Sequence, residues 1–174
     1  MTRWIYLTMA LAIALSALAR PASADVLIAN RSMTASTIAE IFVEEGGVRV
    51  ELEIGEADIG AFRDLLPDAI YGRLGYGDEA LAGRLARFFG EGLVLRADGG
   101  APLAGRLVEI TPNTRVRRDP ISGEPLPIAD DQTEPVVFAV LAYPLPARPA
   151  SLTLHAPADV GGMVAANIGF VAYL

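Results

Sequence analysis

The chain contains no cysteine and no lysine, and His155 is its single histidine. Without cysteine, a disulfide, a thiolate metal site and a cysteine nucleophile are all excluded. One histidine leaves carboxylates as the main possible metal ligands, and these suit Ca²⁺ or Mg²⁺ better than nickel. The hydrophobic core must therefore supply the stability of the fold, and thiol chemistry cannot be the function.

The first 24 residues have the composition of a cleavable export signal. Arg3 precedes an uncharged, mostly apolar run at residues 4–19. This run is shorter than the roughly 20 residues that span a bilayer. Small residues up to Ala24 fit cleavage before Asp25 by a signal peptidase. We therefore expect a periplasmic or secreted protein with no stable membrane insertion after cleavage.

Removal of residues 1–24 leaves twelve arginines and twenty-one acidic residues, a net charge of −9. Phosphates are repelled by such a surface, so nucleic acid and anionic lipid headgroups are not expected as partners. The remaining length suits a single domain, residues 25–174, with its own core.

The most regular hydrophobic pattern lies in residues 48–54, where apolar and charged side chains alternate. This alternation predicts a strand with one buried face. A second apolar run, 38–43, precedes it, and Gly46-Gly47 between the two runs favours a tight hairpin.

Two helices are expected within an insertion at about 57–90. The first covers 58–66 with Asp58 as its N-cap, and the second covers 78–90 with Asp78 as its N-cap. Residues 68–77 between them are expected to form a loop.

Further strands are expected after the insertion. Asp98-Gly99-Gly100 favours a hairpin between 93–96 and 103–111, and 112–135 is interpreted as a long loop. The remaining expected strands are 136–143, buried on both faces, 151–155 and 167–174. Together these elements predict a mainly β fold, an antiparallel β-sandwich with a small two-helix insertion; an α+β fold is the alternative.

No catalytic residues are assigned. Ser151, His155 and Asp159 have the residue types of a hydrolase triad, but positions 151 and 155 of a strand lie about 13 Å apart. The strained turn that exposes a nucleophilic serine is also missing. We therefore expect no enzyme, no cofactor, and a surface position for His155.

Arg115, Arg117 and Arg118 form the one local basic cluster. Guanidinium groups bind carboxylates and phosphates through two hydrogen bonds, so this cluster is a candidate anion-binding or partner-binding site. Internal pairing with a nearby acid, such as Asp119 or Glu109, is the alternative.

Asp130, Asp131 and Glu134 form the densest acidic group and are the weak candidates for a metal site. They lack the alternating oxygen ligands and the central glycine of a calcium loop. A solvated acidic turn is the alternative interpretation.

Three segments carry a resemblance to known proteins: RVRRDPISGEPLP (115–127), YPLPARPASLTL (143–154) and NIGFVAY (167–173). They resemble the start of a group of exported bacterial proteins of unassigned function. More loosely, they are similar to the extracytoplasmic domains attached to the hydrogenase/urease accessory membrane family (HupE/UreJ). The resemblance carries no functional residues. It implies a longer protein, so this chain is expected to be a fragment or a shortened relative.

The leading hypothesis is a non-enzymatic exported module for protein–protein interaction or assembly, with another periplasmic or membrane protein as its partner. The apolar final strand supports this, because a strand at a sheet edge can pair with another chain. One alternative is a metal-handling accessory domain of HupE/UreJ type, which the resemblance implies. The other is an enzyme acting on cell-envelope carbohydrate through paired carboxylates about 5–9 Å apart.

Overall fold

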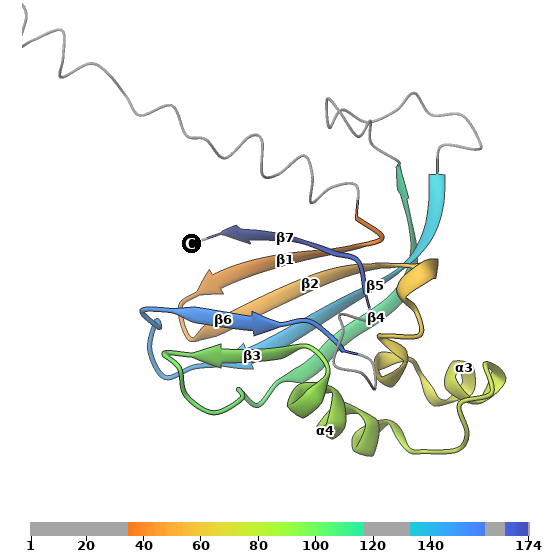
Figure 1. Cartoon of the computed structure of the whole chain (residues 1–174), viewed down its shortest axis with the longest axis horizontal. Helices are drawn as coiled ribbons and strands as arrows, with labels where there is room; N and C mark the ends of the chain where they lie inside the picture. Colours follow the sequence, from red (N-terminus) through yellow and green to blue (C-terminus); the bar gives the residue numbers. More distant parts are fainter. Residues whose placement is uncertain (1–34, 117–132, 159–165, 174) are drawn as a thin grey trace, which may run out of the picture.

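The computed structural model describes residues 35–116, 133–158 and 166–173. Its strands form a five-stranded sheet in the order β4-β5-β2-β1-β7 and a two-stranded sheet of β3 and β6. Helical turns lie between β2 and β3 (Figure 1). The prediction of a mainly β fold with a small helical insertion is therefore confirmed. The proposed signal, residues 1–24, lies outside the described residues.

The elements have the following bounds. The strands are β1 (Thr37–Glu44), β2 (Gly47–Gly55), β3 (Val94–Ala97), β4 (Arg106–Val116), β5 (Thr133–Pro144), β6 (Leu152–His155) and β7 (Ile168–Tyr173). The helical elements are the 3-10 turns η1 (Glu56–Asp58) and η2 (Arg63–Leu65) and the α-helices α3 (Asp68–Arg73) and α4 (Leu81–Glu91).

The predicted hairpin is present as β1 and β2. The two strands pair antiparallel and close at Glu44 opposite Gly47. Gly46 has a φ of 90°, a conformation that glycine adopts without steric cost. The apolar residues of β2 face the core as the alternation predicts, because successive side chains of a strand point to opposite faces. They are Val48, Val50, Leu52 and Ile54, each 2% exposed or less.

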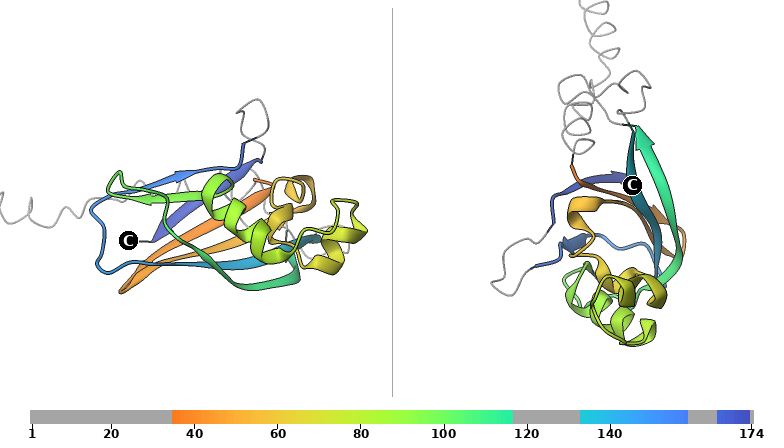
Figure 2. Two further views of the ribbon diagram at one scale, coloured as in Figure 1. Left: turned by 90° about the horizontal axis from the view of Figure 1, so that it is seen from below. Right: turned by 90° about the vertical axis from the view of Figure 1, so that its right-hand side faces the viewer.

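The core lies between the five-stranded sheet and a second layer made of β3, β6 and α4 (Figure 2). The second layer contributes Phe88, Phe89, Leu93 and Leu95, all buried. Tyr143 of β5 lies in the same core and donates a hydrogen bond to the Leu93 carbonyl at 3.3 Å. Burial raises the pKa of the Tyr143 hydroxyl above its usual range.

One pairing of the large sheet is parallel rather than antiparallel. β7 runs parallel to β1, from Thr37 opposite Ile168 onward. The buried carboxylate of Asp58 ties the two strands together. It accepts hydrogen bonds from the Thr37 hydroxyl at 2.7 Å and from the Asn167 amide at 3.2 Å.

Three predictions about the helical insertion are wrong. Residues 58–66 form no α-helix but two 3-10 turns, and the Asp58 side chain joins strands instead of capping a helix. The predicted loop 68–77 contains α3. Asp78 does not cap α4, whose N-cap is Ala80, and the helix continues past Gly90 to Glu91, with Gly92 as its C-cap. A side chain at Gly92 would meet the Phe88 ring at 2.8 Å, which explains the glycine there.

The predicted hairpin between 93–96 and 103–111 forms only next to its turn, where Arg96 bridges Pro102 antiparallel and the Leu103 amide donates to the Leu95 carbonyl at 2.8 Å. The turn itself forms, with positive φ at Asp98 and Gly99. However, β3 pairs with β6, and β4 pairs with β5. The Asp98 carboxylate accepts a hydrogen bond from the Ser151 amide at 2.8 Å, which fixes β6 beside β3.

β4 and β5 extend into the predicted 112–135 loop, of which residues 117–132 lie outside the described parts. β5 is central as predicted. Its core face is buried, at Ala139 and Leu141 for example, whereas its outer face is only half-buried, so the expected burial on both faces is not reached.

Candidate functional site

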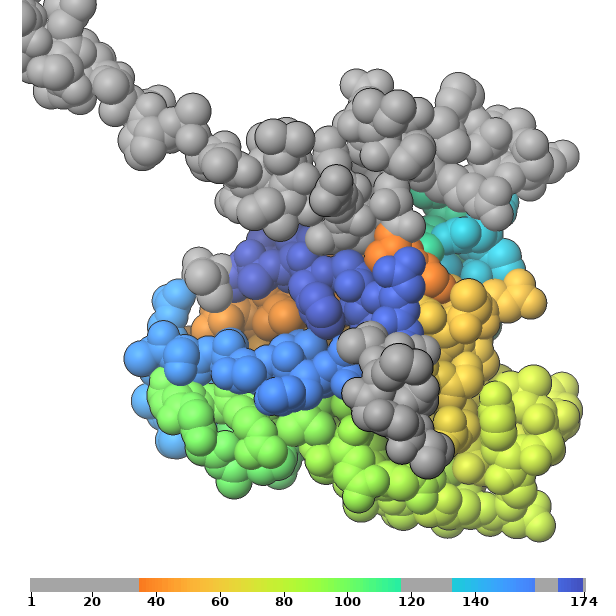
Figure 3. Space-filling model, viewed as in Figure 1, coloured from red at the N-terminus to blue at the C-terminus, as the bar shows by residue number. Residues whose placement is uncertain are grey.

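Residues 67–80 form an arm, hereafter the α3 arm, that projects from one end of the molecule (Figures 1 and 2). It consists of α3 and the Gly75-Tyr76-Gly77 segment. Both glycines have positive φ, 82° and 105°, and these values turn the chain back towards α4. Figure 3 shows the arm standing out in yellow-green from the body of the molecule.

The α3 arm concentrates exposed apolar side chains. Of the six large hydrophobic side chains that are exposed in the described residues, three belong to the arm: Ile70 (37% exposed), Leu74 (51%) and Tyr76 (40%). Ile70 and Leu74 are four residues apart along a helix, so they lie on the same face. Singly exposed hydrophobic residues need no explanation, but a cluster marks an interaction surface. We call Ile70, Leu74 and Tyr76 the arm patch.

A completely buried arginine holds the arm in place. Arg84 of α4 is 0% exposed. Its guanidinium donates to the Leu66 carbonyl at 2.7 Å and to the Glu79 carbonyl at 2.9 Å, and it also pairs with the Asp68 carboxylate. Longer bonds reach the carbonyls of Arg63 and Asp64. Nε contacts one acceptor, Nη1 contacts three carbonyls, and Nη2 contacts the Asp68 carboxylate, so each guanidinium nitrogen of Arg84 is hydrogen-bonded.

Stacked aromatic and guanidinium groups connect Arg84 to the surface of the arm. The Arg84 guanidinium carbon lies 4.1 Å from the centroid of the buried Tyr71 ring. The Tyr71 and Tyr76 centroids are 5.2 Å apart. The Arg63 guanidinium carbon lies 5.8 Å from the Tyr76 centroid. This series of contacts, the cation–aromatic ladder, orients Tyr76, because guanidinium groups are attracted to aromatic rings at such distances.

A second arginine fixes the base of the arm. Arg87 makes two-point contacts with the Asp64 carboxylate, at 2.9 and 3.0 Å, and with the Glu79 carboxylate, both at 2.8 Å. The hydrogen bonds from Arg87 lower the pKa of Glu79 below its usual value. Arg87, in the second half of α4, thereby joins the helix to Asp64 of η2 and to Glu79 at the end of the arm.

Two further arginines flank the arm patch. Arg63 donates to the Gly60 carbonyl at 2.9 Å, and Arg73 donates to the Ala69 carbonyl at 3.1 Å. Both side chains belong to exposed residues, and neither forms an ion pair within the part of the chain that the structure describes. The arm therefore presents an apolar patch next to two accessible positive charges.

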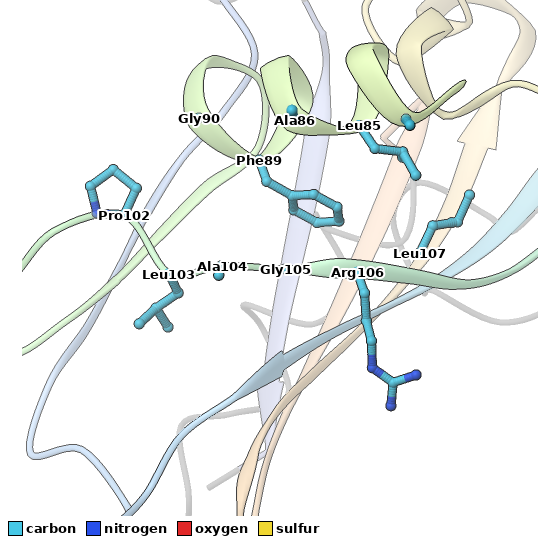
Figure 4. Close-up of a pocket in the computed structure, with 11 residues that line it drawn as sticks. Leu85, Ala86, Phe89, Gly90, Pro102, Leu103, Ala104, Gly105, Arg106 and Leu107 are labelled. Atoms are coloured by element: carbon cyan, nitrogen blue, oxygen red, sulfur yellow. The ribbon is translucent and has the colours of Figure 1, made fainter. Parts of the chain in front are cut away.

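A groove of about 540 Å³ lies between α4 and the segment that leads into β4 (Figure 4). Its helix wall combines the small residues Ala82, Ala86 and Gly90 with Leu85 and Phe89, and its opposite wall is residues 102–107. The Phe89 ring points from α4 towards this segment, whereas the Arg106 side chain points away from the helix. The groove is lined mostly by apolar residues; Arg106 is the one charged residue among those that line it.

Gly105 determines how closely α4 approaches the β4 segment. A side-chain carbon at this position would lie 2.3 Å from atoms of the Phe89 ring and 2.8 Å from the Tyr143 ring. The two rings meet edge to face with centroids 5.5 Å apart. The absence of a side chain at Gly105 lets this aromatic contact form.

A third surface involves the edge strand β7. The Tyr173 ring stacks on Phe42 with centroids 4.6 Å apart, and the Arg49 guanidinium covers Phe42 at 4.0 Å. The Tyr173 hydroxyl donates to Glu40 at 2.8 Å, and this bond raises the pKa of the hydroxyl. These contacts hold the aromatic pair against the sheet, and the Tyr173 ring remains 45% exposed at the sheet edge.

The structure places one residue of the predicted basic cluster. Arg115 lies at the end of β4 and pairs with Glu134. It also donates to the carbonyls of Ala35 and Ser36, both at 2.9 Å. The pairing is internal, as the alternative interpretation held, but Glu134 of the neighbouring strand is the partner. Arg117 and Arg118 lie outside the described residues.

The predicted acidic group is only partly described. Glu134 is bonded to Arg115, and Asp130 and Asp131 lie outside the described residues. Residues 35–116, 133–158 and 166–173 contain no group of three or more histidine or carboxylate side chains that could hold a metal ion.

Of the residues with the types of a hydrolase triad, the structure describes Ser151 and His155, and it does not bring these two together. The amide and hydroxyl of Ser151 both contact the Asp98 carboxylate. His155 is exposed at the end of β6, as predicted. Asp159 lies outside the described residues.

Sequence reasoning missed Arg84, Tyr71 and the arm patch. One signal was available, because Arg84 is three residues from Leu81 and four from Phe88. A helical projection therefore places this charge within the apolar stripe of the helix. An arginine inside such a stripe must find buried acceptors, and here the carbonyls of residues 63–66 supply them.

Comparisons with protein-family models, curated proteins and solved structures give no match. Within the described residues, no helix is long and apolar enough to cross a membrane.

Proposed function

We propose that the mature chain is an exported, non-enzymatic module that binds another protein of the cell envelope. The observation that carries this proposal is the arm patch, three exposed apolar side chains on a projecting arm that a buried arginine holds in place. Exposed clusters of this kind, in which tyrosine and arginine accompany aliphatic residues, are typical of protein interfaces.

The way in which the arm is anchored supports the same proposal. Burying a guanidinium carries a desolvation cost of several kcal/mol, which its hydrogen bonds must offset. The segment that Arg84 holds, the α3 arm, adds only one side chain, Tyr71, to the buried residues. The buried guanidinium therefore orders a surface segment rather than a part of the core. A surface that is already ordered loses less conformational entropy when it binds, so anchoring of this kind favours recognition.

An affinity experiment tests the proposal. Mature protein immobilised on a support is incubated with periplasmic extract and detergent-solubilised membranes of the producing bacterium. We expect one protein to be retained at a constant molar ratio and to co-elute with the mature chain in size-exclusion chromatography. A bait of unrelated sequence but similar negative charge controls for ionic adsorption. Recovery of a monodisperse monomer alone would contradict the proposal.

A further inference from the structure

We infer that the arm patch inserts into an apolar pocket with an acidic rim on the partner protein. This inference rests on the proposed function and adds to it the binding surface and the chemistry of the partner. Ile70, Leu74 and Tyr76 would enter the pocket, and Arg63 and Arg73 would pair with the carboxylates around it.

The shape of the arm sets the first requirement on the partner. The α3 arm projects from one end of the molecule in Figure 1, in the left view of Figure 2 and in Figure 3. A projecting apolar surface loses contact with water only when a concave surface receives it, and apolar pockets on proteins have that shape. The partner must therefore offer a hollow.

Charge sets the second requirement. The mature chain is strongly acidic, yet Arg63 and Arg73 beside the patch form no ion pair among the described residues. The arm's own acids are mostly engaged, since Asp68 pairs with Arg84 and Glu79 with Arg87; Asp78 is the remaining acid of the arm. A positive site on a negative protein selects carboxylates on the partner, and it orients the encounter by electrostatic complementarity.

The cation–aromatic ladder brings the two requirements together. Because Arg63 lies 5.8 Å from the Tyr76 ring, a carboxylate at the rim of the pocket can meet the guanidinium while the ring enters the apolar part. Tyrosine and arginine are the residue types most enriched at the energetic centres of interfaces. The ladder orients both groups before binding, so little side-chain ordering remains.

A lipid bilayer is a poorer receptor for the same patch. The three patch residues are only 37–51% exposed, so insertion would remove little further apolar surface from water. Stable membrane anchoring requires more than one such weak signal. The net charge of −9 also opposes approach to anionic headgroups.

Site-specific photo-crosslinking in cells that produce the protein tests the location. A benzophenone amino acid replaces Leu74 in one variant and Val108 of β4 in another. Both native side chains are 51% exposed, so they form a matched pair. We expect a crosslinked partner at position 74 and none at 108. Equal crosslinking at both positions, or none at 74 while the wild-type protein still forms a complex, would overturn the inference and leave the proposed function standing.

Charge reversal tests the chemistry of the partner. The partner identified by mass spectrometry is purified and titrated calorimetrically with wild-type protein and with the R63E and R73E variants. We expect each reversal to weaken binding about tenfold or more, with a smaller salt dependence than wild type. Arg96 of β3 donates to the Gly100 carbonyl and forms no ion pair among the described residues, so R96E is the control and should bind normally.

Two further measurements decide between occupants. Vesicles of phosphatidylethanolamine and phosphatidylglycerol should not bind the wild-type protein. Light scattering of the wild-type protein should show a monomer; if it shows self-association, the L74S variant tells whether Leu74 is responsible. Binding to vesicles, self-association through Leu74, or unchanged affinity of R63E and R73E would each overturn the inference. The absence of any complex of the wild-type protein would instead refute the proposed function. Circular dichroism and thermal unfolding establish that each variant is folded.

Discussion

The core face of β2 and the α3 arm are ordered by different interactions. On β2, four consecutive inward side chains are buried by apolar packing, and no single contact dominates. In the arm, Tyr71 and the guanidinium of Arg84 take the place of a core, and directional hydrogen bonds provide the order. Damage to β2 should therefore affect the whole molecule, whereas damage to Arg84 should affect one segment.

The largest effect is expected for L52A on β2. Leu52 is 0% exposed in the centre of the sheet, so truncation removes buried methyl groups and leaves a cavity. We expect a loss of about 4 kcal/mol in the free energy of unfolding, spread over the whole fold. Chemical denaturation followed by circular dichroism measures it. V108A at an exposed position of β4 is the control and should change stability by less than about 0.5 kcal/mol.

R84M should produce a smaller and more local effect. The substitution removes five hydrogen bonds, including those to the buried carbonyls of Asp64 and Leu66. We expect a loss of about 3 kcal/mol, with amide exchange and proteolysis accelerated in residues 67–80 but not in the sheet. The R84K variant keeps the positive charge but has fewer N–H donors, so its stability should lie between those of wild type and R84M. If R84M lost protection against amide exchange equally in β2 and in the arm, the two regions would not be ordered by separate interactions.

G105A tests a contact that joins the two layers. Its new methyl group would overlap the Phe89 ring, so α4 or β4 must shift. We expect a destabilisation of about 2 kcal/mol, which thermal unfolding measures.

The matched control for G105A is G90A on the same helix. A methyl group at Gly90 meets nothing within 4 Å, so this variant should be more stable by about 0.5–1 kcal/mol through its helix propensity. If G105A and G90A changed the stability in the same direction, the argument that Gly105 is required by the packing of Phe89 would be contradicted.

The smallest effect is expected from pH. Hydrogen bonds from Arg87 lower the pKa of Glu79 in the folded state below its ordinary value of 4.5. This ion pair therefore contributes stability above that ordinary value, and the contribution is lost as the pH falls through the lowered pKa. Hydrogen exchange of the arm measured between neutral pH and pH 3 should show the loss in wild type. E79Q should remove this part of the pH dependence, whereas an unchanged profile would show that Glu79 is not its source.

The features that the sequence predicts well are those encoded locally. Alternation in residues 48–54 suffices to place a strand and its buried face, because each side chain's direction follows from its neighbours. The turn at Asp98-Gly99 was likewise predicted from local residue types. The pairing of the strands does not follow from local residue types, because β3 and β6 meet through the contact between Asp98 and Ser151, which are 53 residues apart.

The candidate site could be predicted only in part for the same reason. Exposed apolar residues at 70, 74 and 76 can be listed from the sequence, but without Arg84 they belong to a loop with no fixed shape. The position of Arg84 within an apolar stripe indicates that it is buried, whereas four of its five acceptors lie 16–21 residues away. Such a contact depends on how the segments pack, and local periodicity does not specify it.

The parallel pairing of β1 with β7 has a consequence for folding order. β1 and β2 are adjacent in the sequence and can pair as soon as both exist, whereas Tyr173 and Glu40, which bond across β7 and β1, are 133 residues apart. Contacts between such distant positions form slowly. The large sheet therefore closes last, after β7 has been synthesised, and a nascent chain lacking that strand leaves one side of β1 uncovered.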